Sequence, residues 1–154
     1  MKEINLDITH KCTLKCGGCN RQDENYTIVK SEITIDEFEK ILDEFDIIDM
    51  CGGQSDPIFH TKLNQLLKLC YIRKKQVRIH KKKSVYDEAF ESNLHAHWIF
   101  GIDGLPHQSH QYRKNQDGEF LFQRMLDAKK LGIDVEWQYI VFPYNEEYQL
   151  DAYK

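Results

Sequence analysis

The sequence has 154 residues and a formal charge of −4, because 21 lysines and arginines are outnumbered by 25 aspartates and glutamates. Its length fits one domain, and 41% hydrophobic against 30% charged residues allow a buried core. The charge argues against a protein that coats DNA or an anionic membrane, and no apolar stretch is long enough to span a bilayer. Since the N-terminus lacks a signal-peptide core, we expect a cytoplasmic protein with reduced thiols.

Strand and helix patterns alternate along the chain. Residues 3–9 have the period-two pattern of a strand, and residues 34–45 follow a helical stripe. Thr34 and Glu37 have the spacing of a capping box at the start of that helix. The later elements are expected at 47–50 (strand), 63–70 (helix), 77–79 (strand), 84–90 (helix), 97–102 (strand), 121–131 (helix, ended by Gly132) and 135–142 (strand), with Asn145 capping a last helix.

This order amounts to five strand–helix units, which predicts an α/β protein with a mostly parallel sheet. Sheets of this kind place their chemistry at the carboxyl ends of the strands, in the loops that follow. Those loops hold nearly every unusual residue of the chain: a cysteine cluster and the segments 51–54, 80–84, 103–104 and 142–145.

Three of the five cysteines, Cys12, Cys16 and Cys19, lie within eight residues. A loop between strand and helix lets three thiolates converge on one metal centre, and soft sulfur ligands select zinc or an iron–sulfur cluster. Structural zinc usually takes four protein ligands. Either a histidine, of which His10 is the nearest, completes the site, or one position stays open. Cys51 and Cys70 stand alone and are interpreted as ordinary cysteines.

The C-x3-C-x2-C segment from Cys12 to Cys19 resembles the signature of the radical S-adenosylmethionine (SAM) superfamily. Three further segments occur in the order typical of that family. The segment 51–54 (Cys-Gly-Gly-Gln) resembles its Gly-Gly-Glu element, 101–104 (Gly-Ile-Asp-Gly) its Ser-x-Asp-Gly segment, and 141–145 its fifth-strand ending. The resemblance spans nearly the whole chain and implies a partial, open (β/α) barrel of about five units, with residues 1–154 as one core domain.

The resemblance also implies a [4Fe-4S] cluster held by Cys12, Cys16 and Cys19, with one iron left for SAM. Reductive cleavage of SAM would give methionine and a 5′-deoxyadenosyl radical, which abstracts hydrogen from a peptide, protein or nucleotide substrate. An external flavodoxin-like or ferredoxin-like donor would supply the electron. The cofactor-binding residues implied for SAM are Gly52, Gly53, Gln54, Asp103 and Asn145.

Four positions depart from the family pattern. Gly18 stands where an aromatic residue is usual, Gln54 replaces a glutamate, and Gly101 replaces a serine. Residues 79–82 replace a turn of the Thr-Asn-Gly type. Because the chain stops at Lys154, before a sixth strand, we expect a truncated or minimal member whose open barrel is closed by a homodimer or a partner.

Other functions stay open at this point. The three cysteines and a histidine could form a non-catalytic zinc module, and a degenerate module could bind SAM without turnover. Seven basic residues between Arg73 and Lys83 are either a phosphate-contacting surface or, as we favour, a solvated one. His107, His110 and Arg113 lie in a loop at the expected site. One of them could touch substrate, but a surface histidine is the favoured interpretation.

Overall fold

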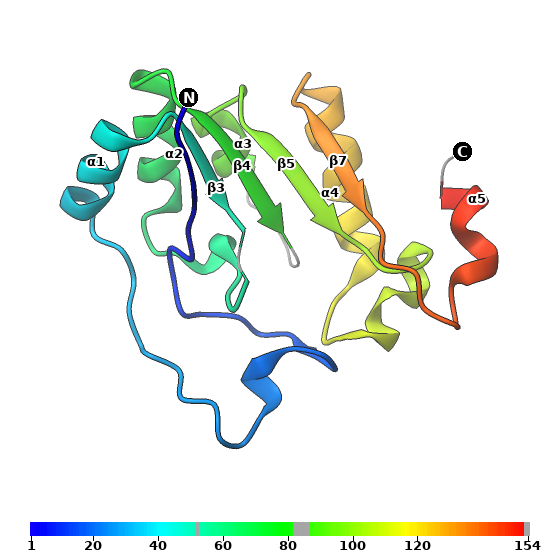
Figure 1. Ribbon diagram of the computed structural model, residues 1–154. Helices are drawn as coiled ribbons and strands as arrows, with labels where there is room; N and C mark the ends of the chain where they lie inside the picture. The colour runs from blue at the N-terminus through cyan, green and yellow to red at the C-terminus, as the bar shows by residue number, and fades with distance from the viewer. Residues whose placement is uncertain (52, 82–86, 153–154) are drawn as a thin grey trace.

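The centre of the molecule is a sheet of five parallel strands in the order β1-β3-β4-β5-β7 (Figure 1). The computed structural model describes residues 1–51, 53–81 and 87–152. Its α/β architecture and parallel pairing confirm the fold class expected from the sequence. The strands are β1 (Glu3–Asn5), β3 (Ile47–Met50), β4 (Gln76–Lys81), β5 (His97–Gly101) and β7 (Val135–Gln138).

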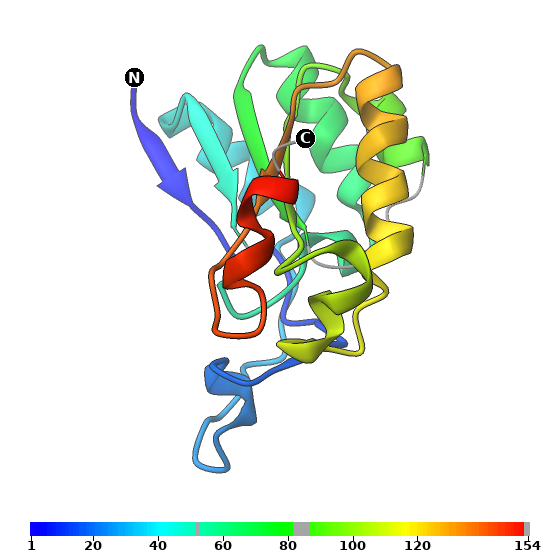
Figure 2. The same ribbon diagram turned by 90° about the vertical axis from the view of Figure 1, so that its right-hand side faces the viewer.

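Four helices cover one face of this sheet, while the short α5 lies apart from it near the C-terminus (Figures 1 and 2). Their apolar side chains share one core with alternate residues of the strands, such as Ile48, Met50, Trp98 and Phe100. The side chains of Trp98 and Phe100 are fully buried and anchor β5 to this core. The helices are α1 (Ile35–Glu44), α2 (Leu63–Ile72), α3 (Asp87–Ser92), α4 (Gly118–Lys130) and α5 (Gln149–Ala152).

The intervening strand residues point to the opposite face, which is polar. Asp49 is paired in register with Arg78, and Arg78 with His97. Arg78 Nη1 lies 2.7 Å from a carboxylate oxygen of Glu3 and 3.7 Å from one of Asp49. The imidazole of His80 lies 3.2 Å from Asp49 on the same face. One sheet therefore has an apolar face under the helices and a charged face that leads toward the loops at its carboxyl edge.

Two local predictions on the helices are confirmed. The side chain of Thr34 accepts a hydrogen bond from the Glu37 amide at 3.2 Å, and the Glu37 carboxylate accepts one from the Thr34 amide at 2.8 Å. This is the expected capping box of α1. Gly132 follows α4 with φ +77, the left-handed conformation that ends helices. Ser84, proposed as a cap of α3, lies outside the described residues.

The last strand is shorter than predicted. β7 ends at Gln138 rather than at residue 142, because side chains take over the hydrogen bonds of the following backbone. Asp103 Oδ1 accepts from the Ile140 amide at 2.9 Å, and Asn145 Oδ1 accepts from the Phe142 amide at 2.7 Å. Asn145 does stand at the N-cap position of a 3-10 helix, Glu146–Tyr148, as the sequence predicts, but its side chain makes no cap hydrogen bond because it is engaged by Phe142 and Ile140.

The first strand also ends early, at Asn5 instead of Thr9. Its continuation still crosses the carboxyl edge of the sheet, where the Leu6 amide donates to the Asp49 carbonyl at 2.8 Å. Thr9 then forms an isolated antiparallel bridge with Glu32, outside the sheet. The loop that carries the cysteines therefore begins after Asn5, whereas the sequence pattern indicates that it begins after Thr9.

A second, two-stranded sheet was not predicted. β2 (Lys15–Cys16) pairs antiparallel with β6 (Arg113–Lys114), and Cys16 is the register partner of Arg113. The Asn115 amide group also donates to the Thr13 carbonyl at 3.2 Å. These contacts tie the cysteine loop to the segment that follows β5. None of the described helices is long and apolar enough to cross a membrane.

Candidate functional site

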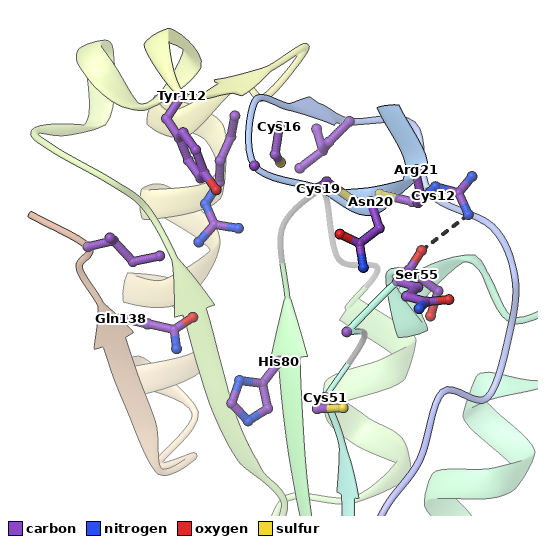
Figure 3. A pocket seen from close by; sticks show the side chains of 16 residues that line it. Cys12, Cys16, Cys19, Asn20, Arg21, Cys51, Ser55, His80, Tyr112 and Gln138 are labelled. Carbon is purple, nitrogen blue, oxygen red and sulfur yellow. Dashed lines mark hydrogen bonds between the residues drawn. The ribbon is translucent and has the colours of Figure 1, made fainter. Parts of the chain in front are cut away.

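A cavity of about 330 Å³ lies at the carboxyl edge of the sheet, where the cysteine loop faces the ends of β3, β4 and β7 (Figure 3). All three cysteines of the C-x3-C-x2-C segment line it. Gly53, Gln54 and His80 line it from two other loops that the sequence placed at the site. The structure thus brings residues of three predicted site loops around one space. The cavity is also lined by Cys51, Tyr112, Arg113, Gln138 and Ile140.

The cysteine loop is held in place by its own backbone and by Arg21. The Cys19 amide donates to the Cys16 carbonyl at 3.1 Å, and a turn of 3-10 helix, Asn20–Gln22, follows at once. Arg21 Nη1 donates to the His10 carbonyl at 2.7 Å and to the Gln54 carbonyl at 3.1 Å. One guanidinium therefore fastens the loop to the segment after β3.

The donor set and the space fit an iron–sulfur cluster. Cys12, Cys16 and Cys19 are partly exposed, none is in a disulfide, and all face the same cavity. Cysteine thiolates are the ligands that such clusters take in proteins. Among the described residues, no three His, Cys, Asp or Glu side chains converge closely enough to hold a single metal ion.

The histidine needed for the alternative zinc site lies elsewhere. His10 does not line the cavity, and its Nδ1 is 2.7 Å from the Ser31 carbonyl oxygen. The position of its ring is therefore fixed by a backbone contact on the far side of the loop. The zinc interpretation would require this ring to turn away from Ser31 and toward the cysteines.

The wall after β3 is joined to the end of β1 by Asp7. Its Oδ1 accepts from the Ser55 hydroxyl at 2.6 Å and from the Gln54 amide at 3.4 Å. A Cβ added to Gly53 would lie 3.4 Å from Asp7 Oδ2, which is ordinary van der Waals contact between the two segments. The Gln54 side chain bonds the Tyr26 hydroxyl. Gly52, the neighbouring predicted site residue, lies outside the described residues.

The opposite wall contains a buried ion pair. Arg113 Nε donates to Asp103 Oδ2 at 2.6 Å, with Arg113 4% exposed and Asp103 0%. A Cβ added to Gly101 would lie 2.8 Å from Arg113 Nη2, so this glycine makes room for the guanidinium. Asp103 thus draws Arg113 inward, to the wall of the cavity. His107 and His110 are exposed, as expected.

Asp103 and Asn145, two predicted contacts of SAM, do not line the cavity. Both are fully buried and hold the chain behind it. Besides binding Arg113, Asp103 accepts from the Ile140 amide, and the Asn145 side chain donates to the Ile140 carbonyl at 3.0 Å. They position Ile140, which lines the cavity. As direct cofactor contacts, they remain predictions.

Sequence reasoning missed Tyr112 and Gln138, which line the cavity, and it interpreted Cys51, which also lines it, as an ordinary cysteine. Gln138 points to the polar face of the sheet by strand alternation, as His80 does, which could have identified it. Burial raises the pKa of the Cys51 thiol, which keeps it protonated at neutral pH. No sequence signal indicates Tyr112, because the pairing of β2 with β6 brings it to the site.

No protein-family model matches this sequence, and no curated protein sequence does either. Solved structures do match. Streptococcus suis SuiB bound to S-adenosylmethionine matches with a TM-score of 0.82 at 14% identity, over 98% of this chain and 36% of SuiB. SuiB bound to the precursor peptide SuiA gives a TM-score of 0.79 at 14% identity, again over 98% of this chain and 36% of SuiB.

Methylornithine synthase (PylB) matches with a TM-score of 0.69 at 14% identity, over 88% of this chain and 43% of PylB. The chain thus spans well under half the length of either of these proteins. At such identities the likeness shows the fold. The five-stranded parallel sheet and its helices match part of the barrel of these radical SAM proteins, which confirms the fold expected from the sequence.

Proposed function

We propose that this chain is the core of a radical SAM enzyme, with a [4Fe-4S] cluster on Cys12, Cys16 and Cys19 and SAM in the adjoining cavity. The observation that carries the proposal is the convergence of those three thiols on one cavity at the carboxyl edge of a parallel sheet. The fold likeness to SuiB, which was solved with bound S-adenosylmethionine, supports it.

When bound, the cluster would supply the electron that cleaves SAM to methionine and a 5′-deoxyadenosyl radical. The protein's part is to hold and orient the cofactor. Three protein thiols leave one iron for the amino and carboxylate groups of SAM. A reductant is needed, and a flavodoxin-like or ferredoxin-like protein is the proposed donor.

Arg113 is well placed to bind a carboxylate. Its Nε is engaged by Asp103, which orients the guanidinium at the cavity wall and leaves its two Nη groups for a ligand. A planar guanidinium matches a carboxylate with two parallel hydrogen bonds. We assign it the methionyl carboxylate of SAM, with Asp103 as its positioning residue.

The methionyl amino group would donate hydrogen bonds to the opposite wall. Gly53 lines that wall, and the absence of a side chain there allows a ligand close to its backbone carbonyl group. Gln54, which also lines the cavity, can accept a hydrogen bond through its amide oxygen. Asn145 would act indirectly, through the segment that contains Ile140.

A peptide or protein is the substrate class that we propose first, because SuiB was also solved with its precursor peptide SuiA. A nucleotide is the other class, and the basic segment 73–83 is its only support.

We also propose that a partner covers the edges of the central sheet. Among the described strands, β1 and β7 each pair on one side only, and proteins generally cover such edges. A second copy of the chain or another segment would do so.

Anaerobic reconstitution with iron and sulfide tests the proposal. We expect about four irons per chain, broad visible absorption that bleaches with dithionite, and 5′-deoxyadenosine formed from SAM. Cys16→Ala should lose the cluster while the α/β fold stays intact by circular dichroism. Cys70→Ala is the matched control, because Cys70 is buried in the core, away from the cavity. This variant should keep the iron of the wild type.

Two results would contradict the proposal. One is a colourless protein that retains a single zinc after reconstitution. The other is stable SAM binding without any 5′-deoxyadenosine under strong reduction, which would favour a module that binds SAM without turnover.

A further inference from the structure

One wall of the cavity is a tyrosine ring from a segment far from the cysteines in sequence. Tyr112 directly precedes β6, and the pairing of Arg113 with Cys16 brings the ring beside the cysteine loop. A Cβ added to Gly18 would lie 3.0 Å from the Tyr112 hydroxyl oxygen. The ring thus fills the space that a side chain at position 18 would enter, and Figure 3 shows it across the cavity from Cys19.

The ring is held by other aromatic side chains. Its centroid lies 4.4 Å from that of Phe142, with the planes tilted by 33°. Phe142 in turn stacks on Tyr144 at 5.6 Å and 8°. The Tyr144 hydroxyl donates to the Asp103 carbonyl at 3.0 Å. The Tyr112 ring is therefore part of a fixed row of three rings and presents a defined apolar surface to the cavity.

Two amide side chains lie around the same space. Asn20 and Gln138 both line the cavity, and neither side chain hydrogen-bonds to another described residue. Amides of this kind pair with the N6 and N7 edge of adenine, which offers one donor and one acceptor. A flat ring bordered by amides suits a nucleobase, which has apolar faces and polar edges.

We infer that Tyr112 is the stacking platform for a purine base in this cavity. Its ring occupies the space that the missing side chain of Gly18 leaves. The inference rests on the proposed function, and under it the ligand is the adenosyl end of SAM. Tyr112 and Arg113 are consecutive in sequence and both line the cavity. One short segment would then bind both ends of the cofactor, the base on Tyr112 and the carboxylate on Arg113.

Binding of S-adenosylhomocysteine, which lacks the cleavable sulfonium, to the cluster-loaded protein tests this by calorimetry. Tyr112→Ala should weaken binding about 5- to 100-fold, the range expected for one lost base-stacking contact. Tyr112→Phe keeps the ring and should bind like the wild type. Tyr112→Leu keeps apolar bulk without a flat ring and should lose affinity as Tyr112→Ala does. Tyr71→Ala, at an exposed ring away from the cavity, is the control and should bind normally.

A reciprocal exchange makes the test specific. Gly18→Phe alone should weaken binding, because its ring would collide with Tyr112. Gly18→Phe combined with Tyr112→Ala should recover affinity relative to either single variant, because a ring then enters from the other side. Methionine alone serves as a second probe. Its affinity should not change in Tyr112→Ala, because it carries no base.

The inference is overturned if folded Tyr112→Ala binds S-adenosylhomocysteine as tightly as the wild type. It is also overturned if Tyr112→Ala loses methionine and S-adenosylhomocysteine to the same degree, because Tyr112 would then only support the wall. Failure of the proposed function looks different, since the wild type itself would then hold no cluster or bind neither probe.

Discussion

Arg113 and Asp103 form an ion pair across 2.6 Å in which neither side chain is more than 4% exposed. The pair connects the end of β5 to β6. Because β6 is paired with β2, it also connects the central sheet to the loop that carries Cys16. The position of the cysteine loop over the sheet therefore depends on two buried charges.

We expect Asp103→Ala to destabilise the protein by about 3 to 5 kcal/mol, because it leaves the Arg113 guanidinium buried without its partner. Urea denaturation followed by circular dichroism measures the change. Glu39→Gln, at an exposed position on α1, is the control and should stay within about 0.5 kcal/mol of the wild type. A loss below about 1 kcal/mol in Asp103→Ala would show that the pair contributes little.

Two glycines should respond differently to the same substitution. A Cβ on Gly118 would lie 2.1 Å from the Pro106 carbonyl oxygen, a backbone atom that cannot move without shifting the chain. A Cβ on Gly17 would meet nothing within 4 Å. Gly118→Ala should therefore cost about 1 to 3 kcal/mol, typical of overpacking, and Gly17→Ala close to nothing. Equal thermal melting temperatures for the two variants would contradict this.

The stability of the segment before α1 should depend on pH through Glu32. Burial works to raise the pKa of this carboxyl, but hydrogen bonds from Lys11, Thr61 and Thr9 together lower it from 4.5 to about 2. A folded-state pKa below the unfolded one stabilises the protein above pH 4.5, and this contribution is lost as the pH falls toward 2.

The expected loss over that window is about 1 to 2 kcal/mol, reduced from the full linkage value because the site is partly solvated. Denaturation curves between pH 6 and pH 2 measure it. Glu32→Gln should show a smaller loss than the wild type between pH 4.5 and 2. Parallel curves for the two proteins would refute the assignment to Glu32.

The five thiols should differ in their reactivity toward iodoacetamide in the cluster-free, reduced protein. Burial raises the pKa of Cys70 to about 12, so its thiolate is scarce at neutral pH, and the pKa of Cys51 is raised for the same reason. We expect Cys12, Cys16 and Cys19 to be alkylated first and Cys70 only after unfolding. Peptide mass spectrometry with time resolves the order, and early labelling of Cys70 would contradict it.

Much of the fold follows from local patterns in the sequence. The sequence predicts the stripe of α1, its cap at Thr34, the strand 47–50 and a strand 97–102, observed as 97–101, because the periodicity of burial is a property of the chain itself. The strand ends were less predictable. β7 stops early because Asp103 accepts a hydrogen bond from the amide of Ile140, 37 residues away, and no local pattern contains that contact.

For the candidate site, the sequence by itself determined where the three cysteines lie, since cysteines that follow a strand must lie at the carboxyl edge of a parallel sheet. Only the tertiary structure decided which walls face those cysteines. The β2–β6 pairing delivers Tyr112 and Arg113 from residues about a hundred positions along the chain. Both side chains lie where the sequence departs from the family pattern. The Tyr112 ring occupies the space beside Gly18, and the Arg113 guanidinium occupies the space beside Gly101. The physical reason is that space left by a missing side chain can be filled from any part of the chain that the fold brings near.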